Sequence, residues 1–430
     1  MNYLLKNVLF TDPEGPAEAK PQALDVYIAK GRIAEIGQDL KGEEATVMDA
    51  KGLRLMPGFI DLHTHFREPG YESKETIQTG AHAALRGGYV ASVSMPNTNP
   101  PCDHQSVIDN IIRKAKEVPY TIFPAGTISK GREGKELSEM ADLVDAGIVA
   151  VTDDHTWVAN AILMRRAMEY ASMFGLIVMS HCEDKNLSAE GVMNEGFAST
   201  RLGLRGIPAA SEDVAVARDI ELARLTGAKL HLSHISTARS AELVRRAKTE
   251  GISVTAEVTP HNLTLTEESL EGYNTDMKIY PPLRTSEDVA AVRAALKAGT
   301  IDCVATDHAP HTAEDKMQEF DHAPFGTIGL ETAFAVVLTE LYHGEKWPLG
   351  EIVNVLSCVP AKILGLKAGF GRIRKGDVAN LALADLDHEW VVSAQDFSSK
   401  SKNSCFLGRK LKGKIRATVC AGRLWEYPPA

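Results

Sequence analysis

The chain lacks three features that mark common classes of protein. None of its apolar runs reaches the roughly 18 residues that a membrane-spanning helix needs. Its start, MNYLLKNVLFTDPEG, has no small-residue cleavage site of the kind that ends a signal peptide. It has no run rich in Lys and Arg, and its formal net charge of -10 leaves no basic surplus for binding phosphates. We therefore expect a cytoplasmic protein that binds neither membranes nor nucleic acid.

Cysteine is also scarce, and no two cysteines form a C-x-x-C pair. The six thiols lie far apart, at Cys102, Cys182, Cys303, Cys358, Cys405 and Cys420. This spacing favours reduced, mostly buried thiols over disulfides or a cysteine zinc site. Any metal ion would then be held by histidine and carboxylate side chains.

The ends of the chain and its middle differ in pattern. With 430 residues, 44% of them hydrophobic, the chain is long enough for one large barrel or two domains. Residues 1–55 alternate short apolar runs with turn signals, and a similar pattern returns over 366–430. Both segments predict short strands, which we expect to pair into one small composite β-sandwich domain. Residues 56–365 are left to form a second domain.

The middle segment repeats one unit, a short apolar run followed by a polar cluster and a segment with helical periodicity. Eight such runs occur: GFIDLHTH, YVASVSMPN, YTIFPAGT, GIVAVTDDH, LIVMSHCED, KLHLSHIS, SVTAEVTPH and DCVATDHAPH. No fixed period of sequence identity relates the units, which argues against a solenoid. The pattern predicts an α/β fold, a (β/α)8 TIM-type barrel, whose polar strand ends converge on one mouth.

Candidate metal ligands stand at several of these strand ends. His63 and His65 are two residues apart, so both side chains point to the same side of their strand. An isolated H-x-H is equally consistent with a polar strand end, but His181, His234 and Asp307 end the fifth, sixth and eighth runs. Histidine and carboxylate ligands without thiolates suit Zn²⁺ or a similar divalent ion. The sequence therefore predicts a metal-dependent hydrolytic site.

Two adjacent acidic residues, Asp153 and Asp154, end the fourth run. Adjacent residues point to opposite sides of a strand, so only one of them should face a metal. A carboxylate in this place could bridge two ions, and an exposed acidic turn is the ordinary alternative.

Two other polar residues are candidates for substrate binding. Arg67 follows the H-x-H pair, and its planar guanidinium could bind a substrate carboxylate, although an arginine beyond a strand is more often a surface residue. Asn97 lies in a proline-flanked loop at the second strand end. Five further histidines are assigned to the core or surface by default, and His155 and His322 are left undecided. The five are His82, His104, His231, His343 and His388.

Several motifs together resemble a known family. PGFIDLHTHFREPG, MPNTNPP, SHCED, LSHIS, EVTPHNL, PPLRT, ATDHAPHTAEDK and APFGTIGLETA resemble dihydroorotases of the amidohydrolase superfamily, of the type with a composite β domain beside the barrel. The resemblance runs from about residue 50 to the C-terminus. It implies the reversible cyclisation of N-carbamoyl-L-aspartate to L-dihydroorotate, a step of de novo pyrimidine biosynthesis.

The resemblance also implies a division of roles among the candidate residues. His63 and His65 would bind the more buried metal, and His181 and His234 a second ion where two are present. Spacing to the S-H-C run assigns the metal-facing carboxylate to Asp154 rather than Asp153. One or two zinc ions would hold the hydroxide nucleophile, with Asp307 as both ligand and proton shuttle.

For the substrate, the resemblance implies that Arg67, Asn97 and His311 hold a carboxylate. The loop over 312–326 would border the pocket, with backbone contacts offered by Pro324 and Gly326.

Three positions depart from the family pattern. His155 replaces a glycine, Asn262 replaces a histidine, and Tyr280 replaces an asparagine that contacts the pyrimidine ring in the family. The Tyr280 hydroxyl could keep one hydrogen bond to the ring. Alternatively, the tyrosine turns away and packs beside the two prolines that follow it.

Two other functions compete with this one. Dihydropyrimidinases, hydantoinases and allantoinases resemble the same fold but bridge their metals with a carboxylated lysine, and GIVAVTDDHTW contains no lysine. A non-catalytic scaffold partner should have lost the metal ligands, which are all present here. The sequence leaves open a homo-oligomer and an association with other pyrimidine-pathway enzymes.

Overall fold

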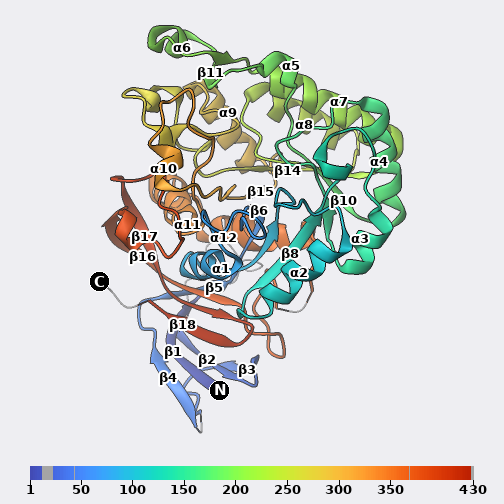
Figure 1. Cartoon of the computed structure of the whole chain (residues 1–430). Coiled ribbons are helices and arrows are strands. Elements are labelled where there is room, and N and C mark those ends of the chain that lie inside the picture. Colours follow the sequence, from blue (N-terminus) through green and yellow to red (C-terminus); the bar gives the residue numbers. More distant parts are fainter. Residues whose placement is uncertain (12–22, 43, 368, 428–430) are drawn as a thin grey trace.

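Eight parallel strands in the middle of the chain form a barrel (Figure 1). The computed structural model describes residues 1–11, 23–42, 44–367 and 369–427. In hydrogen-bonded order the barrel strands are β6 (Phe59–Thr64), β7 (Tyr89–Ser94), β8 (Thr121–Gly126), β9 (Ala150–Val151), β10 (Ile177–Ser180), β13 (Lys229–Leu232), β14 (Val254–Val258) and β15 (Cys303–Val304). Each lies within one of the eight apolar runs, which confirms the predicted TIM-type barrel.

The barrel closes between its last strand and its first. Thr64 and His308 form a parallel bridge, and the His65 N–H donates to the His308 carbonyl at 2.9 Å. The buried carboxylate of Asp61 accepts from the Thr306 N–H at 3.1 Å and from the Thr306 hydroxyl at 2.5 Å. These contacts join the carboxyl ends of β15 and β6, where the candidate ligands lie.

Helices cover the outside of the barrel (Figure 1). The main ones are α1 (Ile77–Arg86), α2 (Gln105–Ala115), α3 (Met140–Ala146), α4 (Ala161–Met173), α7 (Ala210–Thr226), α8 (Ala238–Thr249), α9 (Ser286–Lys297) and α11 (Ala333–Val337). Several begin at a side-chain cap: Thr76, Asn160, Thr237 and Thr285 each accept a hydrogen bond from the first turn of the helix that follows. Within the described ranges, none of the helices is long and apolar enough to cross a membrane.

Shorter elements fill the connections. They are α5 (Lys185–Ser188), β11 (Met193–Asn194), α6 (Phe197–Leu202), β12 (Gly206–Ile207), α10 (Ala313–Lys316), α12 (Leu349–Val353) and α13 (Val359–Ile363). The segment from α5 to β12 protrudes on the mouth side of the barrel (Figure 1).

Strands from both ends of the chain form one further sheet. It contains β1 (Asn2–Phe10), β2 (Ala23–Ala29), β3 (Arg32–Gly37), β4 (Ala45–Asp49), β5 (Arg54–Pro57), β16 (Leu381–Val391), β17 (Lys410–Cys420) and β18 (Arg423–Glu426). The N-terminal part joins the C-terminal part where β5 pairs antiparallel with β16. The composite sheet domain is confirmed, with all its strands in one hydrogen-bonded sheet around a shared apolar cluster. The segment limits near residues 55 and 365 stay predictions.

Candidate metal centre and active site

One cavity of about 360 Å³ at the carboxyl ends of the barrel strands is lined by every candidate site residue. These residues are His63, His65, Arg67, Asn97, Asp154, His181, His234, Tyr280, Asp307, His311, Pro324 and Gly326. They come from separate strands and loops of the barrel, so their convergence follows from its closure.

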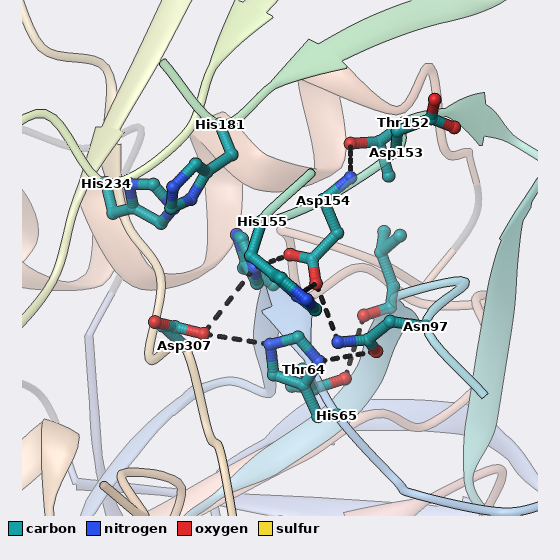
Figure 2. A network of polar contacts seen from close by, with 12 residues as sticks. Thr64, His65, Asn97, Thr152, Asp153, Asp154, His155, His181, His234 and Asp307 are labelled. Carbon is teal, nitrogen blue, oxygen red and sulfur yellow. Dashed lines mark hydrogen bonds and ion pairs between the residues drawn. The ribbon is translucent and has the colours of Figure 1, made fainter. Parts of the chain in front are cut away.

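A compact group of potential metal ligands lines this cavity, and Figure 2 shows two of them, His65 and Asp307, side by side. His63, His65 and Asp307 are buried, and one ligand atom from each lies within 4.8 Å of the others. The Asp307 Oδ1 lies 3.0 Å from the His65 Nε2 and 3.5 Å from the His63 Nε2. Asp154 joins the group, with its Oδ1 at 3.4 Å from the His63 Nε2.

The structure separates the two adjacent aspartates. Asp154 points into the cavity, whereas Asp153 accepts hydrogen bonds from the backbone N–H groups of Ile128 and Ser129, at 2.8 and 3.0 Å. Asp153 also accepts from the Ser129 hydroxyl. Its carboxylate therefore organises the loop after β8, and Asp154 is the one placed to hold a metal.

His181 and His234 form a second pair beside this group (Figure 2). The His181 Nδ1 lies 2.8 Å from the His234 Nε2, and the His181 Nε2 lies 3.3 Å from a carboxylate oxygen of Glu183. In this contact one of the two nitrogens donates a proton and the other accepts it with its lone pair. When both are deprotonated, they can instead converge on one cation.

Backbone strain coincides with the strand ends that carry the site. Arg67, Asp154, His234 and Asp307 have φ values of 60°, 51°, 36° and 48°, in the left-handed region that residues with a Cβ rarely adopt. Such residues cost on the order of 1–3 kcal/mol each and are held by the structure around them. Sharp turns at these positions direct the side chains into the cavity.

The buried charges shift one another's pKa values strongly. Burial alone would lower the pKa of His63, but Asp307, Asp154 and Glu257 raise it well above its usual range. Burial alone would raise the pKa of Asp307, but His63 and His65 hold it well below the usual range. The site thus has an excess of negative charge that a bound cation would compensate.

Hydrogen bonds behind the ligands set which nitrogen faces the cavity. The His63 Nδ1 lies 3.0 Å from one oxygen of Glu257, and the other oxygen lies 3.1 Å from the His231 Nε2. Burial alone would raise the pKa of Glu257, but His231 and His63 lower it to about 2. The ionised carboxylate accepts the His63 Nδ1 proton, which leaves the Nε2 lone pair for a metal.

Glu257 and His231 were missed by reasoning from the sequence, which assigned His231 to the core or surface. Both are buried, and the His231 Nδ1 lies 2.8 Å from the Thr255 hydroxyl on the paired strand. The sequence did offer one sign of this pair. Glu257 is an acidic residue within the apolar run SVTAEVTPH, and a charge inside a barrel strand needs a partner.

Asn97 supports two candidate ligands directly. Its Oδ1 lies 2.9 Å from the His65 Nδ1, and its Nδ2 donates to the Asp154 Oδ2 at 2.7 Å (Figure 2). Both functions of the amide are engaged, and its expected contact with a substrate carboxylate stays a prediction.

Arg67 adds hydrogen-bond donors to the cavity lining. Its half-buried guanidinium donates from the Nε to the Pro310 carbonyl at 3.2 Å, and its Nη2 lies 3.5 Å from the His311 Nε2. In the bordering loop, the Gly326 N–H donates to the Lys278 carbonyl at 2.9 Å, and the Pro324 carbonyl accepts from Lys316 at 2.8 Å. These backbone groups already have partners, and their contact with a substrate stays a prediction.

Tyr280 lies in the cavity wall rather than turned away. Its ring stacks on the His181 ring at a centroid distance of 5.4 Å and meets the Phe325 ring edge-on at 4.7 Å. The Lys185 ammonium lies 4.8 Å from the ring centroid. The tyrosine therefore forms an aromatic surface beside the second pair of candidate ligands.

Comparison with known proteins decides the family. A model described as dihydro-orotase-like matches residues 52–240. A protein named dihydroorotase from Thermoanaerobacter sp. (strain X514) is 47% identical over 425 residues, which cover 99% of this chain and 97% of the relative. Another from Pelotomaculum thermopropionicum is 48% identical and covers 99% and 98%. The chain belongs to the dihydroorotase family.

Solved structures of similar fold include hydantoinases. A D-hydantoinase crystal structure has a TM-score of 0.86 and 25% identity, with 99% of this chain and 95% of that chain covered. An L-hydantoinase from Arthrobacter aurescens also has a TM-score of 0.86, at 24% identity, and covers 98% and 95%. The similarity of these two structures over nearly the whole chain supports the barrel and the additional sheet described above.

Two of the departures from the dihydroorotase pattern have a place in the structure. His155 lies at the cavity rim, with its Nδ1 at 3.0 Å from the Asp154 Oδ2 and at 3.1 Å from the Arg132 Nη2. The Asn262 Oδ1 accepts from the Thr259 hydroxyl at 2.7 Å and stays outside the cavity lining. His155 is therefore a rim residue, and its effect on the Asp154 carboxylate is a hydrogen bond rather than a steric block.

We expect Glu257→Gln to weaken metal binding by about tenfold or more while the fold is kept. Glutamine keeps the size of the side chain but loses the charge that accepts protons from His63 and His231, and changes of this kind behind a ligand typically cost 10- to 100-fold in metal affinity. Metal content after dialysis against graded chelator measures the effect. Glu242→Gln, the same change on the exposed side of α8, is the control. Equal metal retention in both variants and the unmodified enzyme would contradict the role of Glu257.

Proposed function

We propose that the protein is a zinc-dependent dihydroorotase that interconverts N-carbamoyl-L-aspartate and L-dihydroorotate. The observation that carries the proposal is one cavity whose lining combines a histidine and carboxylate cluster with the Arg67–His311 pair. The first suits hydrolysis or formation of an amide, and the second suits a substrate carboxylate. Membership of the dihydroorotase family supports the same reaction.

The donor set fits a divalent metal such as zinc. His63, His65, Asp154 and Asp307 offer nitrogen and oxygen atoms that face one another, and His181 and His234 offer two more nitrogens. No cysteine lines this cavity among the described residues, so the ligands are of the type expected for a catalytic rather than a structural zinc site. When bound, such an ion would polarise the amide carbonyl and lower the pKa of water.

Asp307 is placed to move the proton. Its carboxylate is ionised and lies beside His63 and His65, within reach of a water held by the same cluster, so it can accept a proton from that water. In ring opening, water adds to the amide carbonyl, the carbon–nitrogen bond breaks, and Asp307 returns the proton to the departing nitrogen. In ring closure the same transfers run in reverse.

Arg67 is placed to orient the substrate. Its guanidinium is half-buried and held by the Pro310 carbonyl, so it can bind a carboxylate without first being ordered. A substrate carboxylate bound there would direct the amide of the ring toward the histidine and carboxylate cluster of the same cavity. This orientation distinguishes dihydroorotate from neutral rings such as hydantoin.

The direct test is turnover by the purified enzyme. We expect measurable conversion of dihydroorotate, much slower conversion of hydantoin and allantoin, loss of activity after thorough metal removal, and recovery with zinc. A preference for hydantoin would favour the hydantoinase alternative suggested by the structural neighbours. Full activity without metal would contradict the proposed chemistry.

We expect Asp307→Asn to lower kcat by about 100-fold or more, because an amide cannot accept the proton in the transition state. Since Asp307 is also a candidate ligand, kinetics are measured with zinc in excess and metal content is followed in parallel. Asp142→Asn, on the exposed side of α3, is the control. A variant with a raised KM and an unchanged kcat would rule out the proton-transfer role.

We expect Tyr280→Phe to lower kcat/KM for dihydroorotate by about tenfold, because loss of the hydroxyl leaves one polar group of the ring unpaired at a cost of roughly 1–3 kcal/mol. The stacking on His181 survives in phenylalanine, so the comparison isolates the hydroxyl. Tyr280→Asn, measured in parallel, tests the side chain typical of the family. Kinetics of Tyr280→Phe identical to the unmodified enzyme in both directions would exclude a role for the hydroxyl.

A further inference from the structure

His311 lies between two cationic side chains. Its Nδ1 lies 3.2 Å from the Lys74 ammonium, and its Nε2 lies 3.5 Å from the Arg67 guanidinium. Lys74 comes from the segment before α1, whereas His311 precedes α10. The imidazole therefore joins the cavity to a lysine that does not line it.

The donors on the two sides of the ring determine where its proton lies. An ammonium group has only protons to donate, so the hydrogen bond from Lys74 requires a lone pair on the His311 Nδ1. A neutral imidazole then carries its proton on Nε2. This N–H faces the Arg67 guanidinium, which also only donates. Two donors converge at this point, and an anionic oxygen between them would accept from both.

The charged groups around His311 keep it neutral. Burial, followed by the charges of Arg67, Lys74 and Lys316, lowers its pKa well below the usual range, against the opposing charge of Asp315. A neutral ring with a fixed proton is a directional donor.

We propose that Lys74 is a positioning residue that holds His311 in the tautomer with its proton on Nε2, so that His311 and Arg67 together bind the substrate carboxylate. This inference rests on the proposed function, because it assumes a substrate that carries a carboxylate. It adds to that function a residue outside the cavity that controls recognition.

The surroundings hold both partners in place. Lys74 forms an ion pair with Asp315 at 3.0 Å, and the Ser401 hydroxyl donates to the Lys74 carbonyl at 2.6 Å. The backbone N–H of His311 donates to the Asn403 Oδ1 at 3.0 Å. Gly326, with φ 135°, packs so closely that a Cβ there would lie 3.1 Å from the His311 Cδ2. The ring has little freedom to rotate away from Lys74.

One competing arrangement involves Asp315. Its Oδ2 lies 3.5 Å from the His311 Nδ1 and could accept a proton from it, which would leave Nε2 without one. That arrangement would place an Nδ1 proton against the ammonium at 3.2 Å, which is unfavourable. In it, Lys74 would only neutralise Asp315, and its loss would not affect carboxylate binding specifically.

The test compares two ligands that differ by one carboxylate, orotate and uracil, on the metal-loaded enzyme by calorimetry. We expect Lys74→Met to weaken orotate binding by about tenfold, as for the loss of a hydrogen bond to a charged group, and to leave uracil binding unchanged. Lys74→Arg keeps the charge and the donor, and should recover most of the orotate affinity. Lys400→Met, in the neighbouring cavity that also contacts His311, removes one positive charge nearby and is the control.

Several groups besides Lys74 set the protonation of His311. Burial, Arg67 and Lys316 also lower its pKa, and Asp315 raises it. Binding is therefore measured near neutral pH, where these groups keep the ring neutral and the variants differ in the tautomer. Melting temperature and metal content, measured for each variant, show whether it is folded and loaded.

The outcomes are distinct. Equal weakening of orotate and uracil in Lys74→Met, or weakening of orotate by Lys400→Met to the same extent, would overturn the proposal. An unmodified enzyme that binds orotate no better than uracil would overturn the carboxylate site itself, and Lys74's role with it. Turnover of dihydroorotate by the same preparation reports separately on the proposed function.

Discussion

The site depends on the contact between the last barrel strand and the first. The Asp61 carboxylate accepts from both the N–H and the hydroxyl of Thr306, and the His65 N–H donates to the His308 carbonyl. As a result the side chains of His65 and Asp307, which are 242 positions apart in the chain, approach to 3.0 Å. Without this closure, His63 and His65 would lack their contacts with Asp307.

Closure also brings several buried charges together. Asp154, Asp307 and Glu257 are buried with several imidazoles, and their mutual effects move the pKa values of His63 upward and of the carboxylates downward. Buried charges are costly unless they are paired or coordinate a metal. The left-handed backbone at Asp154 and Asp307 adds to that cost, as is common where function requires a particular side-chain direction.

The cavity lining combines two kinds of group. Histidine and carboxylate side chains gather around His63 and His65, whose Nδ1 atoms face the Glu257 carboxylate and the Asn97 amide oxygen. Arg67 and His311 line the same cavity, and the Arg67 guanidinium can only donate. A molecule with a carboxylate at one end and an amide carbonyl at the other fits this arrangement in one orientation. Binding of the carboxylate therefore positions the carbonyl carbon that reacts.

Much of this arrangement could be predicted from the sequence. Eight apolar runs followed by helical segments indicated the barrel, and polar residues at their ends indicated the candidate ligands, because parallel strands present their carboxyl ends at one face. The spacing of His63 and His65 required that both side chains share a side. The choice of Asp154 over Asp153 needed the family resemblance, and the structure agrees with it through the hydrogen bonds that hold Asp153 in the loop after β8.

The sequence by itself therefore determined the fold class and indicated the strand ends that carry the candidate ligands. Only the tertiary structure decided which groups support them. Glu257 contacts His63, which is 194 positions away in the sequence, and Lys74 contacts His311, which is 237 positions away. Local periodicity states which way a side chain points along its own strand, but hydrogen-bond partners from separate strands and loops are set by how the barrel closes and packs.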